Sequence, residues 1–511
     1  MEDSFKKIIS HSKEYGFVFQ NSEIYDGLSA VYDYGQNGVI LKNNLKEYWW
    51  KSMVQLHQNI VGIDSAIFVH PKTWKASGHI DGFSDPLIDN KDSKKRYRAD
   101  VLIEDYIEQK IEKKIRKEIE KAQKRFGDVF DVNQFTKTNP NILRYLNKKN
   151  EIESMLSKAL EAEDFESLKQ LIVDLGIVCP ISGSKNWTDI KQFNLMYSTQ
   201  MSATQNDENL YLRPETAQGI FLNYLNVQKT GRMKIPFGIA QTGKAFRNEI
   251  VARQFIMRMK EFEQMEMQFF VAPGEQQEWF EYWKKNRLKW HLNLGTPKNK
   301  YRFHEHSKLA HYADAAVDIE YLFPFGFKEV EGIHSRTDFD LSQHQKFSGK
   351  KIQYFDSELN KNYTPYVVET SIGLDRLFLL TLSENMKTEK LENGETRDVL
   401  SLPPALAPYQ LAILPLVKKD GLPEMGKKLF NDLKFEFNCY FEEKDSIGKR
   451  YRRQDALGTP FCITIDHMSL ENQDVTLRNR DTLKQERIKI NELKKEVSQK
   501  TSMNYLLKKL V

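Results

Sequence analysis

Residues 245–270 read AFRNEIVARQFIMRMKEFEQMEMQFF, a stretch that combines an unusual charge pattern with the pattern of a strand. Four arginine or lysine side chains follow Phe246, and three glutamates then fall between residues 261 and 266. Met265, Met267 and Phe269 alternate with polar residues, which is the period of a half-buried strand. Because a solvated charge run would not need these apolar residues, the stretch predicts a hairpin.

The charges of this hairpin have the chemistry that a nucleotide requires. A triphosphate needs fixed positive charge, and the planar fork of arginine binds phosphate oxygens in pairs. Arg247 follows the predicted strand 238–246, and Arg258 comes later, across a loop. Phe262 offers an aromatic face for a purine, and Glu266 follows four residues on. Two interpretations remain open from the charges alone: a nucleotide-binding hairpin, or an ordinary hairpin with solvent-facing charges.

Length and composition indicate a soluble protein of several domains. A chain of 511 residues is long for a single core, so we expect two to four domains. The net charge of +5 indicates no general affinity for polyanions. Three scattered cysteines favour reduced thiols, and we find neither a signal peptide in residues 1–17 nor an apolar run of about 18 residues. We therefore expect a cytoplasmic protein without membrane contact.

Three regions before residue 180 have helical patterns. From Val39 onward, apolar residues recur every four positions, at Leu41, Leu45, Trp49 and Met53. Between Ser93 and Phe126 an isoleucine stripe with the same spacing runs through a charged segment. A further helical region, about Ile142 to Leu175, follows a Thr-Asn-Pro break. These two later segments resemble a helical insertion, whose charges favour surface packing over a functional patch.

The C-terminal part reads as a small α/β domain. Prolines at 403, 404 and 408 indicate a linker. A buried strand, Leu411 to Val417, and a helix, Met425 to Lys434, follow the linker. Two further strands near Cys439 and Cys462 and a charged final helix complete the alternation.

Several stretches resemble the signature motifs of class II aminoacyl-tRNA synthetases. Phe-Arg-x-Glu, a loop and Arg-x-x-x-Phe resemble motif 2, and ETSIGLDRLFLLTL (369–382) resembles motif 3. GLSAVYDYGQNGVILKNNL (27–45) resembles motif 1, the helix of the dimer interface. YLRPETAQGIF (211–221), EFEQME (261–266) and IGKRYRRQDALGTPFCITID (447–466) narrow the resemblance to the glycyl-tRNA synthetase family of the homodimeric kind. The match covers nearly the whole chain in the expected order.

This resemblance implies an α/β (α+β) protein with four segments. They are a first catalytic part with motif 1 (1–92), a helical insertion (93–178), an antiparallel-sheet catalytic core with motifs 2 and 3 (179–402) and an α/β anticodon-binding domain (407–511). The implied activity is ligation of glycine to tRNA(Gly) through glycyl-adenylate, with ATP as substrate, Mg²⁺ as cofactor and a homodimer as the assembly. Glycine, ATP and tRNA are the implied partners.

The resemblance also assigns residues to an ATP site. Arg247 would contact the α-phosphate, Glu249 the adenine amino group and Arg258 the γ-phosphate. Phe262 and Arg376 would enclose the adenine, and Arg247, Glu249 and Arg376 form the expected catalytic set. The complete implied ATP set is Arg247, Asn248, Glu249, Met257, Arg258, Met259, Lys260, Glu261, Phe262, Glu329, Val330, Gly373, Leu374, Asp375 and Arg376. Glu329 is the implied Mg²⁺ ligand, with an ordinary surface acid as the alternative interpretation.

A second implied set surrounds glycine. Glu215, Glu266 and Glu369 resemble the acids around the substrate ammonium, and Arg336 resembles the group that faces its carboxylate. The complete implied glycine set is Arg98, Glu215, Phe262, Glu263, Gln264, Met265, Glu266, Arg336, Glu369, Thr370, Ser371, Ile372 and Gly373. Because three carboxylates repel one another in an empty pocket, at least one of their pKa values should be raised.

The tRNA-binding residues are expected in two places. A basic cluster around Tyr451 suits phosphates and an unstacked base, although such a cluster alone is more often a solvated edge. The implied set is Arg253, Lys449, Arg450, Arg452 and Arg453. Arg253 lies in the motif 2 loop, which would approach the acceptor end.

Two positions depart from the family pattern, and a histidine-containing stretch could be mistaken for a metal site. Gln36 stands where motif 1 usually has proline, and Ser182 replaces the second cysteine of a Cys-Pro-x-Cys-Gly element that begins at Cys179. A structural zinc site is therefore not expected, because too few soft ligands remain. His304, His306 and His311 are interpreted as a polar stretch near the pocket, with a metal site as the alternative.

Two rival functions were weighed against the ligase. A synthetase paralogue without catalysis would have lost the ATP residues, yet Arg247, Arg258 and Arg376 are all present. An acyl-adenylate enzyme without a tRNA substrate would not need the basic C-terminal domain.

Overall fold

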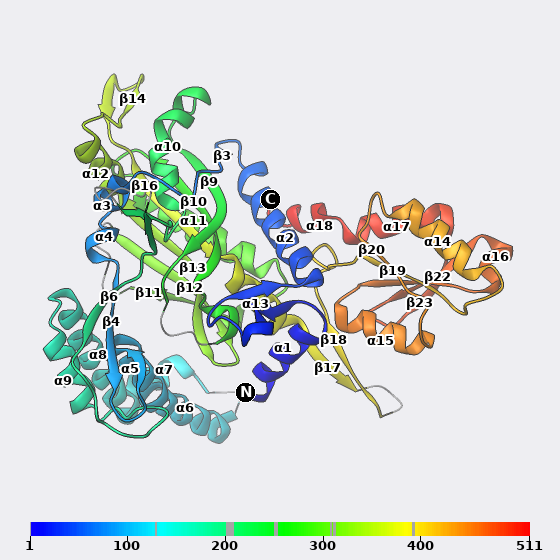
Figure 1. Ribbon diagram of the computed structural model, residues 1–511, viewed down its shortest axis with the longest axis horizontal. Coiled ribbons are helices and arrows are strands. Elements are labelled where there is room, and N and C mark those ends of the chain that lie inside the picture. The colour runs from blue at the N-terminus through cyan, green and yellow to red at the C-terminus, as the bar shows by residue number, and fades with distance from the viewer. Residues whose placement is uncertain are drawn as a thin grey trace. The chain divides into compact units, whose positions relative to one another are not determined.

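The computed structural model describes residues 2–127, 130–200, 209–249, 254–306, 309, 313–390 and 394–511. It consists of two compact units (Figure 1). The first comprises Met1–Ser77, Ser198–Arg247 and Arg253–Val511, and the second Gly78–Tyr197 and Asn248–Ala252.

A seven-stranded sheet is the centre of the first unit. Its order is β11-β12-β13-β16-β10-β9-β3, and all neighbours are antiparallel except β3 and β9. The strands are β3 (Ile60–Gly62), β9 (Phe237–Phe246), β10 (Glu261–Val271), β11 (Tyr301–Glu305), β12 (Ala315–Phe323), β13 (Gly326–Thr337) and β16 (Tyr366–Gly373). The predicted hairpin is confirmed as β9 and β10, and the antiparallel catalytic sheet is confirmed with it.

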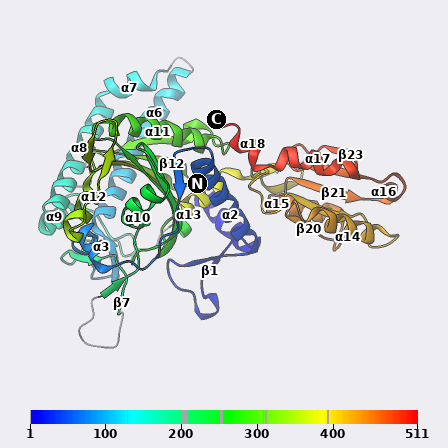
Figure 2. The same cartoon turned by 90° about the horizontal axis from the view of Figure 1, so that it is seen from above.

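Helices cover both faces of this sheet. On one face, α10 (Ala217–Thr230) and α12 (Phe339–Ser348) share an apolar cluster with residues such as Phe270 and Val367. On the other face, α11 (Gln276–Leu292) and α13 (Leu374–Asn385) pack against β16, and α13 also lies beside α2 (Gln36–Trp50) (Figure 2).

Helix α2 is the predicted motif 1 helix. Its four predicted apolar positions, Leu41, Leu45, Trp49 and Met53, are all fully buried, so the four-residue spacing is confirmed. The helix begins at Gln36, earlier than the apolar pattern indicated, because the first turn carries polar and small residues. A π-helical turn, Lys51–Gln55, continues it.

The other described elements of the first unit are short. They are α1 (Glu2–Glu14), β1 (Val18–Gln20), β2 (Tyr32–Tyr34), α3 (Pro71–Ala76), β7 (Ser198–Gln200), β8 (Asn209–Tyr211), β14 (Tyr354–Asp356), β15 (Lys361–Tyr363), β17 (Met386–Lys390) and β18 (Thr396–Leu400).

The second unit is a helical insertion on a small sheet. Its described elements are α4 (His79–Gly82), β4 (Ser84–Asn90), β5 (Lys95–Arg98), α5 (Ala99–Tyr106), a π-helical turn (Ile107–Glu112), α6 (Lys113–Phe126), α7 (Val132–Thr138), α8 (Pro140–Glu161), α9 (Phe165–Asp174) and β6 (Lys191–Asn194). The helix predicted from Ser93 begins only at Ala99, because residues 95–98 pair with β4. The isoleucine stripe is buried as predicted at Ile103, Ile107 and Ile111, while Ile115 and Ile119 are half-buried.

The C-terminal α/β domain is confirmed. Its sheet has the order β20-β19-β21-β22-β23, with the first three strands parallel. The elements are β19 (Leu411–Pro415), α14 (Leu422–Leu433), β20 (Cys439–Phe441), α15 (Ile447–Leu457), β21 (Phe461–Ile465), α16 (His467–Asn472), β22 (Asp474–Asn479), β23 (Gln485–Lys489), α17 (Ile490–Thr501) and α18 (Met503–Leu507). Among the described helices, none has the length and apolar character needed to cross a bilayer.

Candidate active site

The candidate site lies on the sheet face beneath α10 and α12. Glu266 of β10 is directly opposite Gln241 of β9 and Ser371 of β16. Directly paired residues of neighbouring strands point to the same face, and Gln268 and Glu369, two pairs further along, share the face of Glu266. Strand pairing thus brings together glutamates that are about a hundred residues apart in sequence.

Glu266 is a buried carboxyl held by hydroxyl groups. Thr216 Oγ1 donates to its Oε2 at 2.5 Å, and Ser371 Oγ donates to its Oε1 at 2.7 Å. Burial, followed by the charges of Glu369 and Glu215, raises the pKa of Glu266 to about 8. The expected upward shift within the three-acid cluster is therefore found at Glu266.

Glu369 is held by charged partners instead. Its Oε2 accepts from Gln268 Nε2 at 2.6 Å and from Arg336 Nη1 at 3.1 Å, and His334 Nδ1 lies 2.8 Å from its Oε1. Although burial opposes its charge, Arg336 and His334 lower the pKa of Glu369 below its usual range. The acids of one pocket thus have different preferred charge states.

A chain of buried polar contacts continues from Glu369 to Glu215. Arg336 forms a two-pronged ion pair with Asp340, at 2.8 and 3.1 Å. Gln218 Nε2 donates to both Asp340 Oδ1 and Glu215 Oε1 at 2.9 Å, and His344 Nε2 contacts Gln218 Oε1 at 2.9 Å. This network fixes one wall of the pocket, and it binds Arg336 through two carboxylates.

The predicted phosphate-binding arginines lie at the end of the same hairpin and at the start of α13. Arg247 donates from Nε to Pro214 O at 3.1 Å, and its guanidinium lies 5.2 Å from the centre of the Phe262 ring. Arg376 pairs with Glu329, with 2.9 Å between Nη1 and Oε2. Arg376 lowers the pKa of Glu329 more than any other group does. Half-buried cations next to an aromatic face fit a nucleotide.

A β-bulge in β13 decides which way Glu329 points. The register with β12 pairs Ile319 with Glu331 and Glu320 with Glu329, which leaves Val330 as an extra residue. Glu331 therefore faces α11, where it is fully buried between Arg287 and His291, at 2.5 and 2.7 Å. The side chain of Glu329, 46% exposed, contacts Arg376 instead.

Two acidic residues of the predicted sets have side chains on the face of the sheet that α11 and α13 cover, opposite to the candidate site. Glu263 pairs with Lys42 at 3.0 Å and with Lys46. Asp375 accepts from Lys42 at 2.9 Å, from the hydroxyl of Tyr34 and from the backbone N–H of Glu263 at 2.8 Å. These carboxylates connect motifs 2 and 3 to helix α2, so they are not available to a ligand on the other face.

Other predicted residues are oriented by the same alternation. The apolar cluster on the side of α11 and α13 contains six buried residues of the predicted sets: Met257, Met259, Met265, Val330, Ile372 and Leu374. Thr370 is also buried. Gly373 lies at the end of β16, opposite Gln264. The half-buried members of the sets are Arg258, Lys260 and Glu261. The apolar members of these sets can meet a ligand only through their backbone.

Three predicted residues belong to the second unit. Arg98 pairs with Asp85 at 3.0 Å and with Asp100 at 2.5 Å, and these acids raise its pKa despite burial. Glu249 adds to that effect from the same unit, and Asn248 donates its backbone N–H to Leu195 O at 2.8 Å. Arg253 lies outside the described residues.

Helix α15 separates the predicted tRNA-binding cations. Lys449 and Arg452 are exposed and Arg453 is half-buried, so these three share one face. Arg450 was grouped with them in the sequence, and this assignment is wrong. Its side chain is 1% exposed and donates to the carbonyls of Pro415 and Glu442 at 2.7 and 3.0 Å. One residue along a helix is a turn of about 100°, which moves Arg450 into the core.

The described residues include no group of three or more metal-ligating side chains. Cys179 Sγ lies within 3.3 Å of the hydroxyls of Ser93 and Tyr97, and these bonds occupy a thiol that a zinc site would need. His306 pairs with Asp318 at 2.9 Å, which raises its pKa, and its ring lies next to that of His304. His311 lies outside the described residues.

Sequence reasoning missed the polar residues that orient the acids. Thr216 and Gln218 lie within YLRPETAQGIF, and His334 is directly opposite Glu369 in the sheet. A polar residue at an inward position of a strand or helix is the signal that could have indicated them. Lys42 gave no such signal, because a lysine in an amphipathic helix is ordinarily at the surface.

Three family models match the chain. "Glycyl-tRNA synthetase insertion domain 1" matches residues 85–195, "tRNA synthetase class II core domain (G, H, P, S and T)" matches 197–385, and "Anticodon binding domain" matches 410–500. The helical unit, the central sheet and the C-terminal domain thus each correspond to a known family.

Solved structures with low sequence identity share the fold. Prolyl-tRNA synthetase from Giardia lamblia, in complex with prolyl-adenylate, has a TM-score of 0.58 at 16% identity over 100% of this chain and 80% of that one. Prolyl-tRNA synthetase from Cryptosporidium parvum, with L-proline and AMP, has a TM-score of 0.55 at 12% identity over 98% and 76%. Both support the class II architecture.

Curated relatives are far more similar in sequence. Glycine–tRNA ligase from Chlorobaculum tepidum is 48% identical over 94% of this chain and 97% of its own length. The enzymes of the same name from Macrococcus caseolyticus and Staphylococcus haemolyticus are 48% and 47% identical, over 96% and 98% of this chain and 98% and 100% of theirs. The chain therefore belongs to the glycine–tRNA ligase family of class II aminoacyl-tRNA synthetases.

Proposed function

We propose that the chain activates glycine with ATP to form glycyl-adenylate and then transfers the glycyl group to the 3′ end of tRNA(Gly). The observation that carries this proposal is the acid cluster formed by the buried Glu266 and Glu369 and the half-buried Glu215, beside Arg247 and Arg376. Acids that attract an ammonium and cations that attract phosphates are needed side by side for amino-acid activation.

The acid cluster would bind the ammonium of glycine. Glycine offers little besides its two charges, so binding must come from electrostatic contacts. Glu266 would become ionised when the ammonium arrives, because an adjacent cation reverses the upward shift of its pKa. Larger amino acids bring extra atoms, which a wall fixed by the network from Glu369 to Glu215 would exclude by overlap. Arg336 would contribute positive charge near the carboxylate while it remains bound to Asp340.

The arginines would bind ATP. We infer that Arg247 contacts the α-phosphate, that Arg258 and Arg376 reach the γ-phosphate, and that the adenine lies between Phe262 and Arg376. Glu249 would accept from the adenine amino group. The half-buried placement of Arg247 and its contact with the Phe262 ring support this arrangement.

Glu329 fits a Mg²⁺ ligand, because Mg²⁺ usually takes one or two carboxylates together with substrate phosphates. Its carboxylate is accessible, and the pKa of this group is lowered, so it is ionised at neutral pH. When bound, Mg²⁺ would neutralise charge that develops on the phosphates.

Activation then depends on positioning. The carboxylate of glycine attacks the α-phosphorus in line, and pyrophosphate leaves. A carboxylate is already ionised at neutral pH, so this step needs no base from the protein. Arg247 would stabilise the charge on the α-phosphoryl oxygens. In the second step a hydroxyl of the terminal adenosine of tRNA attacks the acyl carbon, and AMP leaves.

The tRNA would be held by the C-terminal domain (407–511) and the motif 2 loop. The cations of α15 that would contact tRNA are Lys449, Arg452 and Arg453. Arg253, in the motif 2 loop, would approach the acceptor end of the tRNA. Because phosphate contacts release counterions, we expect tRNA binding to weaken steeply with salt.

We further infer a homodimer in the cytoplasm. Ile24 and Tyr25, just before motif 1, and Leu28 at its start are exposed apolar side chains, and such a group is typical of an interface. All three cysteines are free, which suits a reducing compartment.

The decisive experiment is ATP–pyrophosphate exchange with each of the twenty standard amino acids. Glycine alone should support exchange, and charging of tRNA(Gly) should follow with the same preparation. Exchange with alanine or serine as fast as that with glycine would overturn the substrate assignment. No exchange with any amino acid would overturn the enzyme assignment and favour a paralogue that only binds RNA.

A further inference from the structure

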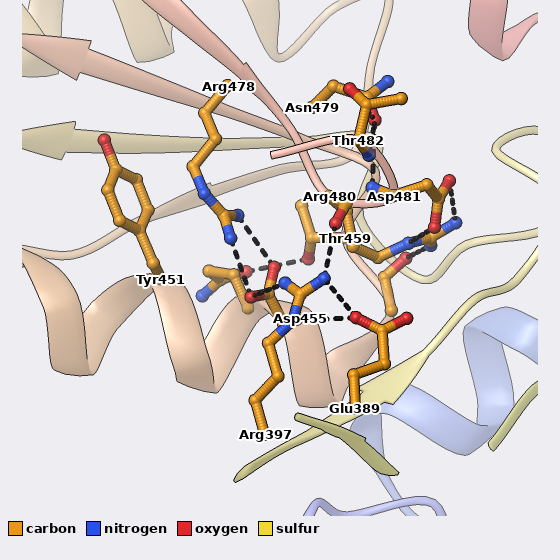
Figure 3. Close-up of polar contacts among 12 residues, drawn as sticks. Glu389, Arg397, Tyr451, Asp455, Thr459, Arg478, Asn479, Arg480, Asp481 and Thr482 are labelled. Atoms are coloured by element: carbon orange, nitrogen blue, oxygen red, sulfur yellow. Dashed lines mark hydrogen bonds and ion pairs between the residues drawn. The ribbon is translucent and has the colours of Figure 1, made fainter. Parts of the chain in front are cut away.

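A buried cluster of charges connects the catalytic region to the C-terminal domain, and none of its members belongs to the proposed ATP or glycine site. Figure 3 shows Arg397 and Arg478 converging on the carboxylate of Asp455. Arg397 Nη1 donates to Asp455 Oδ2 at 2.6 Å, and Arg478 donates to both oxygens at 2.8 and 2.9 Å. All three residues are buried.

The partners of Asp455 come from different parts of the fold. Arg478 lies on β22, so its pair with Asp455 is internal to the C-terminal domain. Arg397 lies on β18, in the hairpin that begins at Met386 directly after helix α13. Arg397 also donates to the carbonyl of Arg480 at 3.1 Å. The Arg397–Asp455 pair therefore attaches α15 to the continuation of the motif 3 helix.

The same helix carries the candidate tRNA cations. Lys449, Arg452 and Arg453 line a cleft of about 640 Å³ together with Thr396, Arg397 and Asp398 of β18. Arg452 also pairs with Glu395 at the hairpin, an exposed contact of the kind that contributes little to stability. Of the described contacts between α15 and the hairpin, the buried one at Asp455 is the firmer, because desolvated and doubly bonded groups have little freedom.

We propose that Arg397 is a positioning residue for the tRNA-dependent step. By holding Asp455, it fixes the cations of α15 relative to the hairpin and hence to helix α13, whose first turn carries Arg376. This inference rests on the proposed function, since it assumes that Lys449, Arg452 and Arg453 contact tRNA. It concerns only the second step, because amino-acid activation needs no contact with the C-terminal domain.

The test separates the two steps in one enzyme preparation. In Arg397→Met, the KM for tRNA in glycyl transfer should rise roughly tenfold, while glycine-dependent pyrophosphate exchange stays within about twofold of wild type. Asp455→Asn keeps the shape of the side chain. It should likewise raise the KM for tRNA and leave glycine-dependent pyrophosphate exchange nearly unchanged. Arg397→Lys retains the charge and one donor, so it should restore much of the affinity for tRNA.

The matched control is Glu389→Gln. Glu389 accepts from Arg397 at 2.6 Å but lies within the hairpin, on β17, and leaves the bond to Asp455 intact. Its KM for tRNA should stay within about twofold of wild type. Normal charging by both Arg397→Met and Asp455→Asn would overturn the inference, as would a parallel loss of exchange and charging. Absence of glycine exchange in the wild type would instead overturn the proposed function.

Discussion

Two glutamates on adjacent strands have opposite pKa shifts because their partners differ. Glu369 contacts Arg336 and His334, and these contacts lower its pKa in spite of burial. Glu266 contacts only the hydroxyls of Thr216 and Ser371 among the bonds described above, so burial dominates and raises its pKa to about 8. The empty pocket thus contains one acid that a cationic substrate can ionise.

This difference predicts a pH dependence of glycine binding. A raised pKa means that Glu266 is largely protonated below about pH 8, and the ammonium of glycine favours the ionised form. The KM for glycine should therefore fall as the pH rises from about 6.5 toward 8, by up to roughly tenfold per unit, and then level off. In Glu266→Gln the KM should be higher and flat over this range. A flat profile in the wild-type enzyme would contradict the assignment.

Arg247 offers a second test at the residue scale. Arg247→Ala removes the guanidinium proposed to meet the α-phosphate, so pyrophosphate exchange should fall by two to three orders of magnitude, roughly the cost of losing one preorganised donor. The melting temperature should change little, because the side chain is only half-buried. Near wild-type exchange by a folded Arg247→Ala protein would exclude this role.

At the scale of elements, three sequence motifs are joined by one buried lysine. Lys42 of α2 lies 2.9 Å from Asp375 and 3.0 Å from Glu263, and its ammonium is 4.1 Å from the centre of the Tyr34 ring. Glu263 follows Phe262, and Asp375 precedes Arg376. The two residues proposed to enclose adenine are thus positioned by their neighbours on the far face of the sheet.

Lys42→Met should therefore weaken ATP binding. Because two buried carboxylates lose a partner, the free energy of unfolding should fall by about 3 kcal/mol. The KM for ATP should rise about tenfold and that for glycine should stay within about twofold, since the acids proposed to bind the ammonium of glycine are not attached to α2. Lys42→Arg should restore most of the affinity. Lys46→Met is the matched control, because Lys46 contacts Glu263 alone of the two carboxylates in the described ion pairs and is more exposed. Equal effects of Lys42→Met and Lys46→Met would refute the argument.

At the scale of the whole molecule, the surface before motif 1 requires an explanation. Ile24 is 88% exposed and Tyr25 80% exposed, and Leu28 lies nearby in the sequence. Apolar side chains at such exposure are costly in water and are stabilised when a second copy covers them.

Ile24→Asp combined with Tyr25→Asp should therefore shift the protein from dimer to monomer. Light scattering coupled to size-exclusion chromatography would give the mass directly. Lys6→Asp, a change of charge on helix α1, serves as the surface control and should leave the mass unchanged. A wild-type protein that is monomeric at micromolar concentration would disprove the proposed assembly.

Much of this architecture could be predicted because the decisive signals are local. The alternation of Met265, Met267 and Phe269 identified β10, and the four-residue spacing from Leu41 onward identified α2. Such periods depend only on which face of an element is buried, so they can be read without knowledge of its neighbours. The short strands β4, β5 and β6 were missed because their charged sequences carry no such period.

The sequence by itself therefore determined the family, the hairpin and the residue types of the site, since these depend on spacing along the chain. Only the tertiary structure decided that Lys42 and Arg450 are buried, that a bulge turns Glu329 and Glu331 to opposite faces, and that Arg397 reaches Asp455. Each of these outcomes depends on partners distant in sequence. The charge of a side chain is local information, whereas its burial and its partners are set by packing.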